Sequence, residues 1–301
     1  MSTKRYISYI AAALVLTAGI VMGGFFDLHV AGFMYKGHPL WAIIATVIGL
    51  YIFDGSFVLL FGAICRQFYE SYNKRSKRII TVAICGVLAF ITATCGAKGL
   101  WSGSVLGLYV DSGLNNIPAS MITGLIIFFP LFLLGFYLNG RNFDKDTRRK
   151  LIILVSVLTI AFFSNMLVKN TVMRPRYRIT LEGYEGIGFI PLFSVLENGR
   201  ELMNRFALRS DDLSSFYSGH ALDAALNLII FPSMALFIPK LKGKEEALTI
   251  AATLVMIPIL ISRMVLGDHY LSDISFGALV GLMFCFLYLL LISPKPRFPG
   301  R

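Results

Sequence analysis

Long apolar runs separated by short polar segments dominate the chain. Several of these runs approach the roughly 20 residues that a helix needs to cross a hydrocarbon layer of ~30 Å. The candidate spans lie near residues 6–26, 41–64, 79–98, 118–138, 151–168, 221–239, 247–262 and 274–292. This pattern predicts an all-α fold, a polytopic transmembrane helix bundle of about eight spans.

The first run follows Lys4 and Arg5, as the apolar part of a secretory signal peptide does. Its length favours a retained membrane anchor over a cleaved signal peptide. Either choice leaves the later spans in the same orientation.

The composition agrees with a membrane protein. Hydrophobic residues make up 56% of the chain and charged residues 15%, and the mean hydropathy is +0.71. A soluble protein carries about 25% charged residues. These values exclude a soluble enzyme, a secreted disulfide scaffold, a nucleic-acid-binding module and a disordered chain. Because the sequence contains no repeat and no long hydrophilic domain, we expect residues 1–301 to form one membrane domain.

The net charge of +11 reflects how Lys and Arg are distributed between the spans. They gather at both termini and in segments 65–78, 139–150 and 240–246, which alternate along the chain with less basic segments. Cytoplasmic loops carry an excess of Lys and Arg. Both termini are therefore predicted to be cytoplasmic. The two remaining basic loops, 169–220 and 263–273, are predicted to lie outside.

Three polar clusters fall on this predicted outer side, each next to a span. The first is KNTVMRPRYR at residues 169–178, the second is YSGH at residues 217–220, and the third occupies residues 262–273. Ionisable residues at membrane level are candidates for function. The clusters also contain the residue types that bind phosphate and transfer protons.

The cationic members of these clusters suit a phosphate dianion. Lys169, Arg176 and Arg263 can supply three charge-assisted hydrogen bonds, worth roughly 1.5–3 kcal/mol each. Ser218 and Gly219 precede a predicted helix, whose free N–H groups and positive dipole end favour an anion. We expect these five residues to bind the substrate phosphate.

Two histidines can divide the chemistry of phosphate transfer. His269 and Asp273 are four residues apart, so a helix that starts near them lets the carboxylate orient the imidazole. The other ring nitrogen is then a nucleophile. His220, at the start of another helix, is free to protonate the leaving oxygen.

The three clusters resemble the pattern of the type 2 phosphatidic acid phosphatase family, which shares its site with the vanadium haloperoxidases. That pattern is K-x6-R-P, then P-S-G-H, then S-R-x5-H-x3-D. The third element is matched in full by Ser262, Arg263, His269 and Asp273, and all three occur in the family's order. The resemblance covers roughly residues 150–292.

The resemblance implies a role for each matching residue. His269 attacks phosphorus, Asp273 orients His269, and His220 is the general acid. The phosphate is held by Lys169, Arg176, Ser218, Gly219 and Arg263. Residues 151–292 then form the phosphatase core, and residues 1–150 supply additional N-terminal spans.

The sequence departs from the family's pattern at two prolines. Tyr177 and Tyr217 stand where the family has proline, and losing a fixed φ there can loosen the loops. An Arg-Pro pair does occur at residues 174–175, but it lies too close to Lys169 for the six-residue spacing. The spacing therefore favours Arg176 as the phosphate ligand.

The outer loop also contains a predicted short helix. Asn198 and Glu201 have the spacing of a capping box, and Leu202, Met203 and Phe206 then share one side. One hypothesis is a helix that rests on the outer leaflet and gates the lipid headgroup. The alternative is a solvated cap over the bundle.

Together these features predict an integral membrane phosphatase that hydrolyses a lipid phosphate or diphosphate through a phosphohistidine. A polyprenyl diphosphate, phosphatidic acid or phosphatidylglycerol phosphate would fit. We expect no metal and no other cofactor, membrane lipids and the lipid phosphate as partners, and no nucleic acid. The expected location is a bacterial plasma membrane, with the active site facing outward.

Other functions remain open from the sequence. A lipid phosphotransferase or a sugar-phosphate phosphatase would use the same site. Asp54 and Asp223 lie within spans and suit a transporter, although neither an inverted repeat nor paired broken helices accompany them. A further alternative is a silent relative, in which Tyr177 and Tyr217 have disrupted the site.

Overall fold

The computed structural model describes residues 3–101, 117–140, 144–209 and 211–293. These residues are mainly α-helical, and no strand occurs among them. The α-helices are α1 (Thr3–Met34), α2 (Leu40–Ser71), α3 (Arg75–Leu100), α4 (Ile117–Ile127), α5 (Pro130–Leu138), α6 (Lys145–Val172), α7 (Tyr177–Thr180), α8 (Gly199–Arg205), α9 (Gly219–Ser233), α10 (Glu245–Val265) and α11 (Leu271–Ile292). Two short 3₁₀ helices, η3 (Met234–Leu236) and η4 (Pro239–Leu241), follow α9.

The predicted membrane bundle is confirmed. Within the described residues, 8 helical segments are long and apolar enough to cross a membrane, and they coincide with the eight predicted runs. The chain is therefore an integral membrane protein with an all-helical fold. The short helices α7 and α8 lie in the loop between α6 and α9, where short helices were expected.

Two predicted spans differ in detail from the structure. The first helix does not end near residue 26 but continues to Met34, which brings Asp27 into the helix. The fourth span is broken into α4 and α5 just before Pro130. Proline lacks an N–H and its ring clashes with the carbonyl four residues earlier, so it kinks or breaks a helix.

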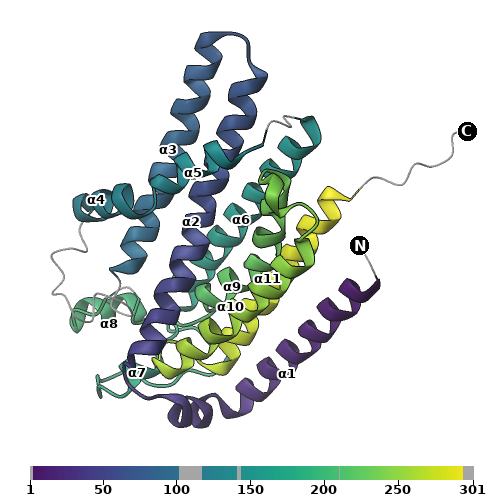
Figure 1. Cartoon of the computed structure of the whole chain (residues 1–301). Helices are drawn as coiled ribbons and strands as arrows, with labels where there is room; N and C mark the ends of the chain where they lie inside the picture. Colours follow the sequence, from purple (N-terminus) through teal and green to yellow (C-terminus); the bar gives the residue numbers. More distant parts are fainter. Residues whose placement is uncertain (1–2, 102–116, 141–143, 210, 294–301) are drawn as a thin grey trace, which may run out of the picture.

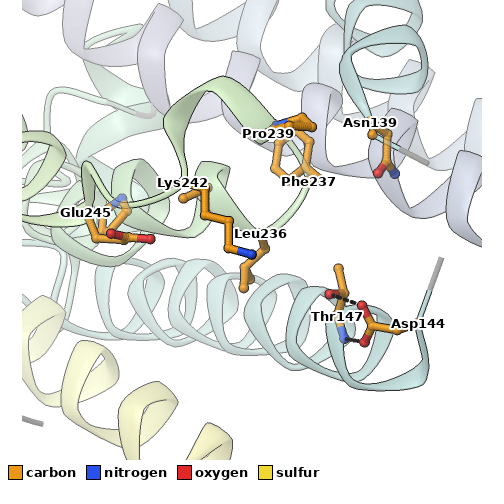
Figure 2. Close-up of a pocket in the computed structure, with 11 residues that line it drawn as sticks. Asn139, Asp144, Thr147, Leu236, Phe237, Pro239, Lys242 and Glu245 are labelled. Carbon is orange, nitrogen blue, oxygen red and sulfur yellow. Dashed lines mark hydrogen bonds between the residues drawn. The ribbon is translucent and has the colours of Figure 1, made fainter. Parts of the chain in front are cut away.

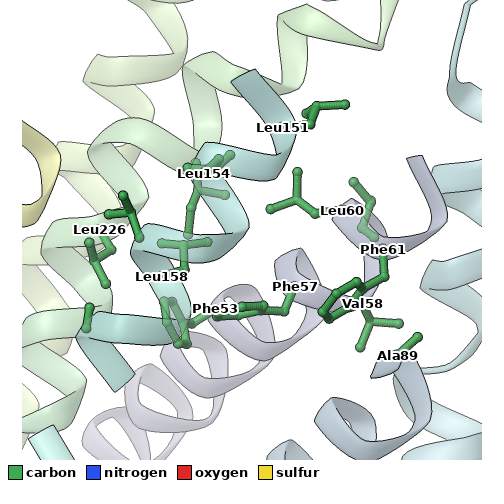
Figure 3. Packing of buried hydrophobic residues seen from close by; sticks show 14 of the residues in the cluster. Phe53, Phe57, Val58, Leu60, Phe61, Ala89, Leu151, Leu154, Leu158 and Leu226 are labelled. Atoms are coloured by element: carbon green, nitrogen blue, oxygen red, sulfur yellow. The ribbon is translucent and has the colours of Figure 1, made fainter. Parts of the chain in front are cut away.

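Helix α2 is the centre of the bundle. In the most apolar stretch of α2, 61% of the residues are buried. The corresponding share is 6% in α1, which lies at the periphery. Side chains of α2 pack with side chains from α3, α6 and α9 in one apolar core, which Figure 3 shows in part. Its labelled members are Phe53, Phe57, Val58, Leu60, Phe61, Ala89, Leu151, Leu154, Leu158 and Leu226.

The polar clusters meet at one end of this bundle. Helices α6 and α10 end there, and α9 and α11 begin there, each next to one of the three clusters. Figure 1 shows α7 and α8 at this end, whereas the start of α1 and the end of α11 lie away from it. The helix bundle thus carries the three clusters to a common surface.

Small residues allow α4 to pack directly on α3. A Cβ atom at Gly124 of α4 would lie 2.7 Å from the carbonyl oxygen of Ala93 and 2.9 Å from the amide nitrogen of Thr94. Both are backbone atoms of α3, which cannot move aside as the tip of a side chain can. In membranes, small residues at such crossings let helix backbones approach closely.

We therefore expect Gly124→Ala to destabilise the protein. Overpacking of this kind costs about 1–3 kcal/mol, and thermal unfolding in detergent should occur at a lower temperature. Gly86→Ala is the matched control, because a Cβ atom at Gly86 of α3 meets nothing within 4 Å. Equal melting temperatures for the two variants would contradict the close α3–α4 contact.

Candidate active site

Backbone hydrogen bonds join the three polar clusters. The first cluster contacts Ser215, which lies just before the second cluster. The first and the second cluster each contact the third. The bonds run from the Ser215 N–H to the Arg174 carbonyl (2.9 Å), from the Arg178 N–H to the Gly267 carbonyl (3.0 Å) and from the Ser218 N–H to the Asp273 carbonyl (3.1 Å). Segments nearly 100 residues apart in the sequence are thus held in one surface.

Asp268 is the centre of the cationic part of the site. Its carboxylate lies 2.5 Å from Nη1 of Arg176, 2.7 Å from Nη2 of Arg263 and 3.0 Å from Nε of Arg178. Burial opposes ionisation of Asp268, but the guanidinium groups of Arg263, Arg176 and Arg178 outweigh it and hold its pKa well below the usual value. Asp212 and Asp211 also lie near Arg178, at 2.7 and 3.6 Å, so three carboxylates face the three arginines, and the neighbouring Lys169 gives the group its net positive charge.

Lys169 and His220 lie on the accessible side of this cluster. Both side chains are partly exposed, whereas Arg176 and Arg263 are buried. A Cβ atom at Gly219 would lie 3.7 Å from Nζ of Lys169, so the ammonium group lies next to the start of α9. Ser218 is the N-cap of α9, as expected, with its hydroxyl 3.3 Å from the Ala221 N–H.

His269 has one engaged and one unengaged ring nitrogen. Its Nδ1 lies 2.7 Å from the carbonyl oxygen of Ser215, which only accepts hydrogen bonds, so Nδ1 carries the proton. Its Nε2 is buried and has no hydrogen-bond partner among the described residues. The lone pair of Nε2 is therefore available to an electrophile.

Asp273 does not orient His269 directly, and this corrects the sequence-based expectation. The Asp273 carboxylate is 4.0 Å from Nδ1 of His269, too far for a hydrogen bond. Instead it accepts hydrogen bonds from the Ser215 hydroxyl (2.5 Å) and the Tyr270 N–H (3.0 Å). Asp273 thus positions Ser215, and the Ser215 carbonyl positions the imidazole.

The surroundings of His269 favour its neutral form. Burial lowers the pKa of His269 well below 6.5, and the positive charges of Arg263, Arg176 and Lys169 lower it further. A neutral imidazole with a free Nε2 is the form required of a nucleophile.

Arg174, the alternative phosphate ligand, occupies a different position. Its guanidinium group is 1% exposed and lies 2.9 Å from Asp27 and 2.5 Å from Asp273. Arg176 instead shares Asp268 with Arg263. The contacts favour Arg176 over Arg174 at the cationic cluster, and its binding of phosphate stays a prediction.

Comparison with family models identifies a relationship over the half of the chain that holds this site. Residues 149–297 match the model of the PAP2 superfamily. The chain belongs to the PAP2 superfamily. Membership supports a phosphatase-type activity in a membrane protein. Comparisons with curated proteins and with solved structures found no significant match.

In this PAP2 member, aromatic packing surrounds the two tyrosines that stand in place of the motif prolines. Tyr177 begins α7, and its ring contacts those of Tyr35 and Tyr270 edge to face, with centroids 5.6 and 6.2 Å apart. The Tyr217 hydroxyl lies 3.0 Å from the Ser164 hydroxyl, and its ring packs on Phe276. Both loops are therefore anchored by rings in place of a fixed proline φ.

Four residues of the site were missed from the sequence of this PAP2 protein: Asp268, Ser215, Asp27 and Thr46. Asp268 is adjacent to His269 and surrounded by basic motifs, a signal that could have identified it. Asp27 lies one residue beyond the predicted end of the first span, so the predicted boundary did not mark it as an intramembrane charge. Ser215 acts through its carbonyl, which leaves no sequence signal. Thr46 of α2 accepts a hydrogen bond from Arg263 (3.1 Å).

The outer-loop helix of the PAP2 protein has the predicted apolar side but lacks the predicted capping box. Helix α8 begins where expected, but Asn198 makes no side-chain capping hydrogen bond, so the capping box is absent. Its apolar side, centred on the buried Leu202, packs against a small core within the loop that includes Met173 and Leu213. This packing favours a cap over the bundle and leaves less apolar surface for a lipid leaflet.

A pocket of about 400 Å³ lies elsewhere, between the end of α5, the start of α6 and η4 (Figure 2). There Asp144 caps α6 by accepting a hydrogen bond from the Thr147 N–H at 2.7 Å. Asp144 is the N-cap of α6 and Lys169 lies near the other end of the helix. At a rise of ~1.5 Å per residue, the helix separates the pocket from Lys169 by about 37 Å. The pocket is therefore not part of the candidate active site of this PAP2 protein.

We expect the titration of His269 to reflect its environment. In a 15N NMR titration of histidine-labelled protein in detergent, the His269 signal should titrate with a midpoint below 6.5, because burial and nearby cations disfavour the imidazolium. The chain has 4 histidines, so His269→Asn assigns the signal by its loss. A midpoint at or above 6.5 would contradict the arrangement of cations around this ring.

Removing the charge of Asp268 should destabilise the PAP2 fold. Asp268→Asn leaves three guanidinium groups without their shared carboxylate, and breaking a buried ion pair costs about 3–5 kcal/mol. The melting temperature in detergent should fall accordingly. In the control Asp211→Asn, the carboxylate is 22% exposed and lies 3.6 Å from Arg176 and Arg178, so the loss should be about 0–1 kcal/mol. A smaller loss for Asp268→Asn than for the control would refute this central role.

Proposed function

We propose that the protein is a membrane phosphatase that removes phosphate from a lipid phosphate or diphosphate through a phosphohistidine on His269. The observation that carries the proposal is the unengaged Nε2 of the neutral His269 beside a cluster of cations. His220 also has a buried Nε2 without a hydrogen-bond partner among the described residues. Two such imidazoles next to Lys169, Arg176 and Arg263 supply a nucleophile, a general acid and an anion site.

In the first step, Nε2 of His269 forms a bond to phosphorus while the bond from phosphorus to the lipid oxygen breaks. His220, as the imidazolium that the bound phosphate anion stabilises, gives its proton to that leaving oxygen. Charge-assisted hydrogen bonds from the cations, with the N–H groups at the start of α9, stabilise the negative charge on the transferring group.

In the second step, water attacks phosphorus and the bond to His269 breaks. His220 accepts the proton of the water, so it returns to its starting form. The covalent intermediate divides a very slow uncatalysed hydrolysis into two easier steps.

The location of the site favours a lipid substrate. The three clusters are connected directly to α6, α9, α10 and α11, so the phosphate site lies where the headgroup of a membrane lipid would reach it. Apolar side chains remain exposed on the helices around it and suit contact with lipid chains. Polyprenyl diphosphate, phosphatidic acid and phosphatidylglycerol phosphate are the candidates, and the distribution of Lys and Arg favours an outward-facing site.

The proposal predicts phosphate release by the purified protein in detergent. A panel of these lipid phosphates, assayed with chelator present, should identify a substrate. His269→Ala should reduce turnover to background, and His220→Ala should reduce kcat about 10²–10⁴-fold. Vanadate should inhibit. Quenching in alkaline detergent with 32P-labelled substrate should trap a base-stable, acid-labile phosphoprotein that His269→Ala lacks.

His38→Ala is the matched control, because His38 is an exposed histidine in the loop between α1 and α2. It should retain wild-type turnover. A strict requirement for a divalent cation, or full activity of His269→Ala, would overturn the mechanism. Transfer of the labelled phosphate to an added alcohol in preference to water would identify a phosphotransferase, and ion flux in liposomes without phosphate release would identify a transporter.

A further inference from the structure

We propose that Asp27 of α1 is a positioning residue for His269, which makes the first span part of the catalytic apparatus. This inference rests on the proposed function of His269 as nucleophile. It also gives a role to a helix that lies outside the matched segment 149–297.

Asp27 is buried against the start of α11. It is 2% exposed, although it lies near the end of a peripheral helix. One carboxylate oxygen accepts a hydrogen bond from the Ser272 N–H at 2.9 Å. The other accepts hydrogen bonds from the Ser272 hydroxyl and from Nη2 of Arg174, the latter at 2.9 Å. Asp27 thus satisfies one of the free N–H groups at the N-terminus of α11.

From Asp27 a continuous series of contacts leads to the nucleophile. Nη1 of Arg174 lies 2.5 Å from the Asp273 carboxylate, which accepts a hydrogen bond from the Ser215 hydroxyl at 2.5 Å. The Ser215 carbonyl accepts the hydrogen bond from Nδ1 of His269 at 2.7 Å. Every member of the series is almost fully buried, so solvent does not weaken these contacts.

The charges in this series match the needs of the reaction. Asp27 and Asp273 carry two negative charges and Arg174 one positive charge, which leaves a net negative charge behind the ring of His269. Phosphorylation at Nε2 places a positive charge on that ring. A buried opposite charge stabilises this form, and the stabilisation is greater in the transition state than with the neutral ring.

A close approach of α1 to α11 makes the contact possible. A Cβ atom at Gly23 would lie 2.6 Å from the Ser272 amide nitrogen and 2.8 Å from the Asp27 carboxylate. By contrast, a Cβ atom at the adjacent Gly24 would meet nothing within 4 Å. Gly23 therefore admits the Asp27 carboxylate to the start of α11, whereas Gly24 faces away from it.

Asp27→Asn tests the inference. The substitution keeps the size of the side chain and removes the charge, so kcat should fall at least about tenfold while KM stays within about twofold of wild type. The NMR titration midpoint of His269 should move to lower pH, because the imidazolium loses a nearby negative charge. The double variant Asp27→Asn/Arg174→Gln regains the net negative charge. The titration midpoint of His269 in the double variant should therefore lie closer to the wild-type value than it does in Asp27→Asn.

Gly23→Ala and Gly24→Ala form a matched pair of controls. Gly23→Ala should lower kcat and shift the His269 signal, because the added methyl group displaces the start of α11. Gly24→Ala should leave both unchanged. A loss of kcat in Asp27→Asn without any change in the His269 signal would indicate a structural role only and would overturn the inference.

The two proposals can fail separately. If the wild-type protein releases no phosphate from any lipid phosphate, the proposed function fails, and the NMR titration in detergent still decides whether Asp27 acts on His269. An unchanged His269 titration in a folded Asp27→Asn protein overturns the positioning role, whatever the activity. Wild-type kcat in Asp27→Asn overturns it equally.

Discussion

The active-site end of the molecule depends on the ion pairs that the buried Asp268 carboxylate forms with three arginines. Transferring an ion from water into a protein interior costs several kcal/mol, and only close opposite charges and hydrogen bonds offset this cost. Asp268 provides them for Arg176, Arg178 and Arg263 together. Because these arginines come from two clusters far apart in the sequence, the need to neutralise them fixes how the loops fold over the helix ends.

A second group of buried charges performs a different task. Asp27, Asp273 and Arg174 form this group, and Asp273 holds Ser215, whose carbonyl holds Nδ1 of the imidazole. His269 therefore lies between a group of net positive charge and one of net negative charge. The first suits an incoming phosphate anion, and the second suits the positive charge that a phosphorylated ring acquires. This polarity across one residue is the electrostatic basis of the proposed mechanism.

The N-terminal helices are more than additional membrane anchors. Helix α2 is the most buried span, and its Thr46 accepts a hydrogen bond from Arg263 at 3.1 Å. Helix α1 is peripheral along most of its length, yet Asp27 contacts Ser272 and Arg174. Helices outside the PAP2 segment thus contribute side chains to the groups that surround its histidines. A description of the site from the segment 149–297 alone would omit these contacts.

The sequence by itself determined the spans and the identity of the three motifs. Apolar runs of the length of a bilayer predict spans regardless of packing, because every backbone polar group in lipid must be satisfied within a helix. The motif spacing likewise grouped His220, His269 and the surrounding cations, and it put Ser218 at a helix N-terminus. These features depend on local order along the chain, which the sequence contains directly.

Only the tertiary structure decided which groups pair. The four-residue spacing allowed Asp273 to reach His269, but the Ser215 carbonyl lies closer and occupies Nδ1. The roles of Arg174 and Asp27 depend on a contact between two residues 147 positions apart, one in the loop after α6 and one in α1. Such contacts form because a buried charge takes the nearest available partner in space, and nearness in space is set by how the helices pack, which no periodicity along the sequence encodes.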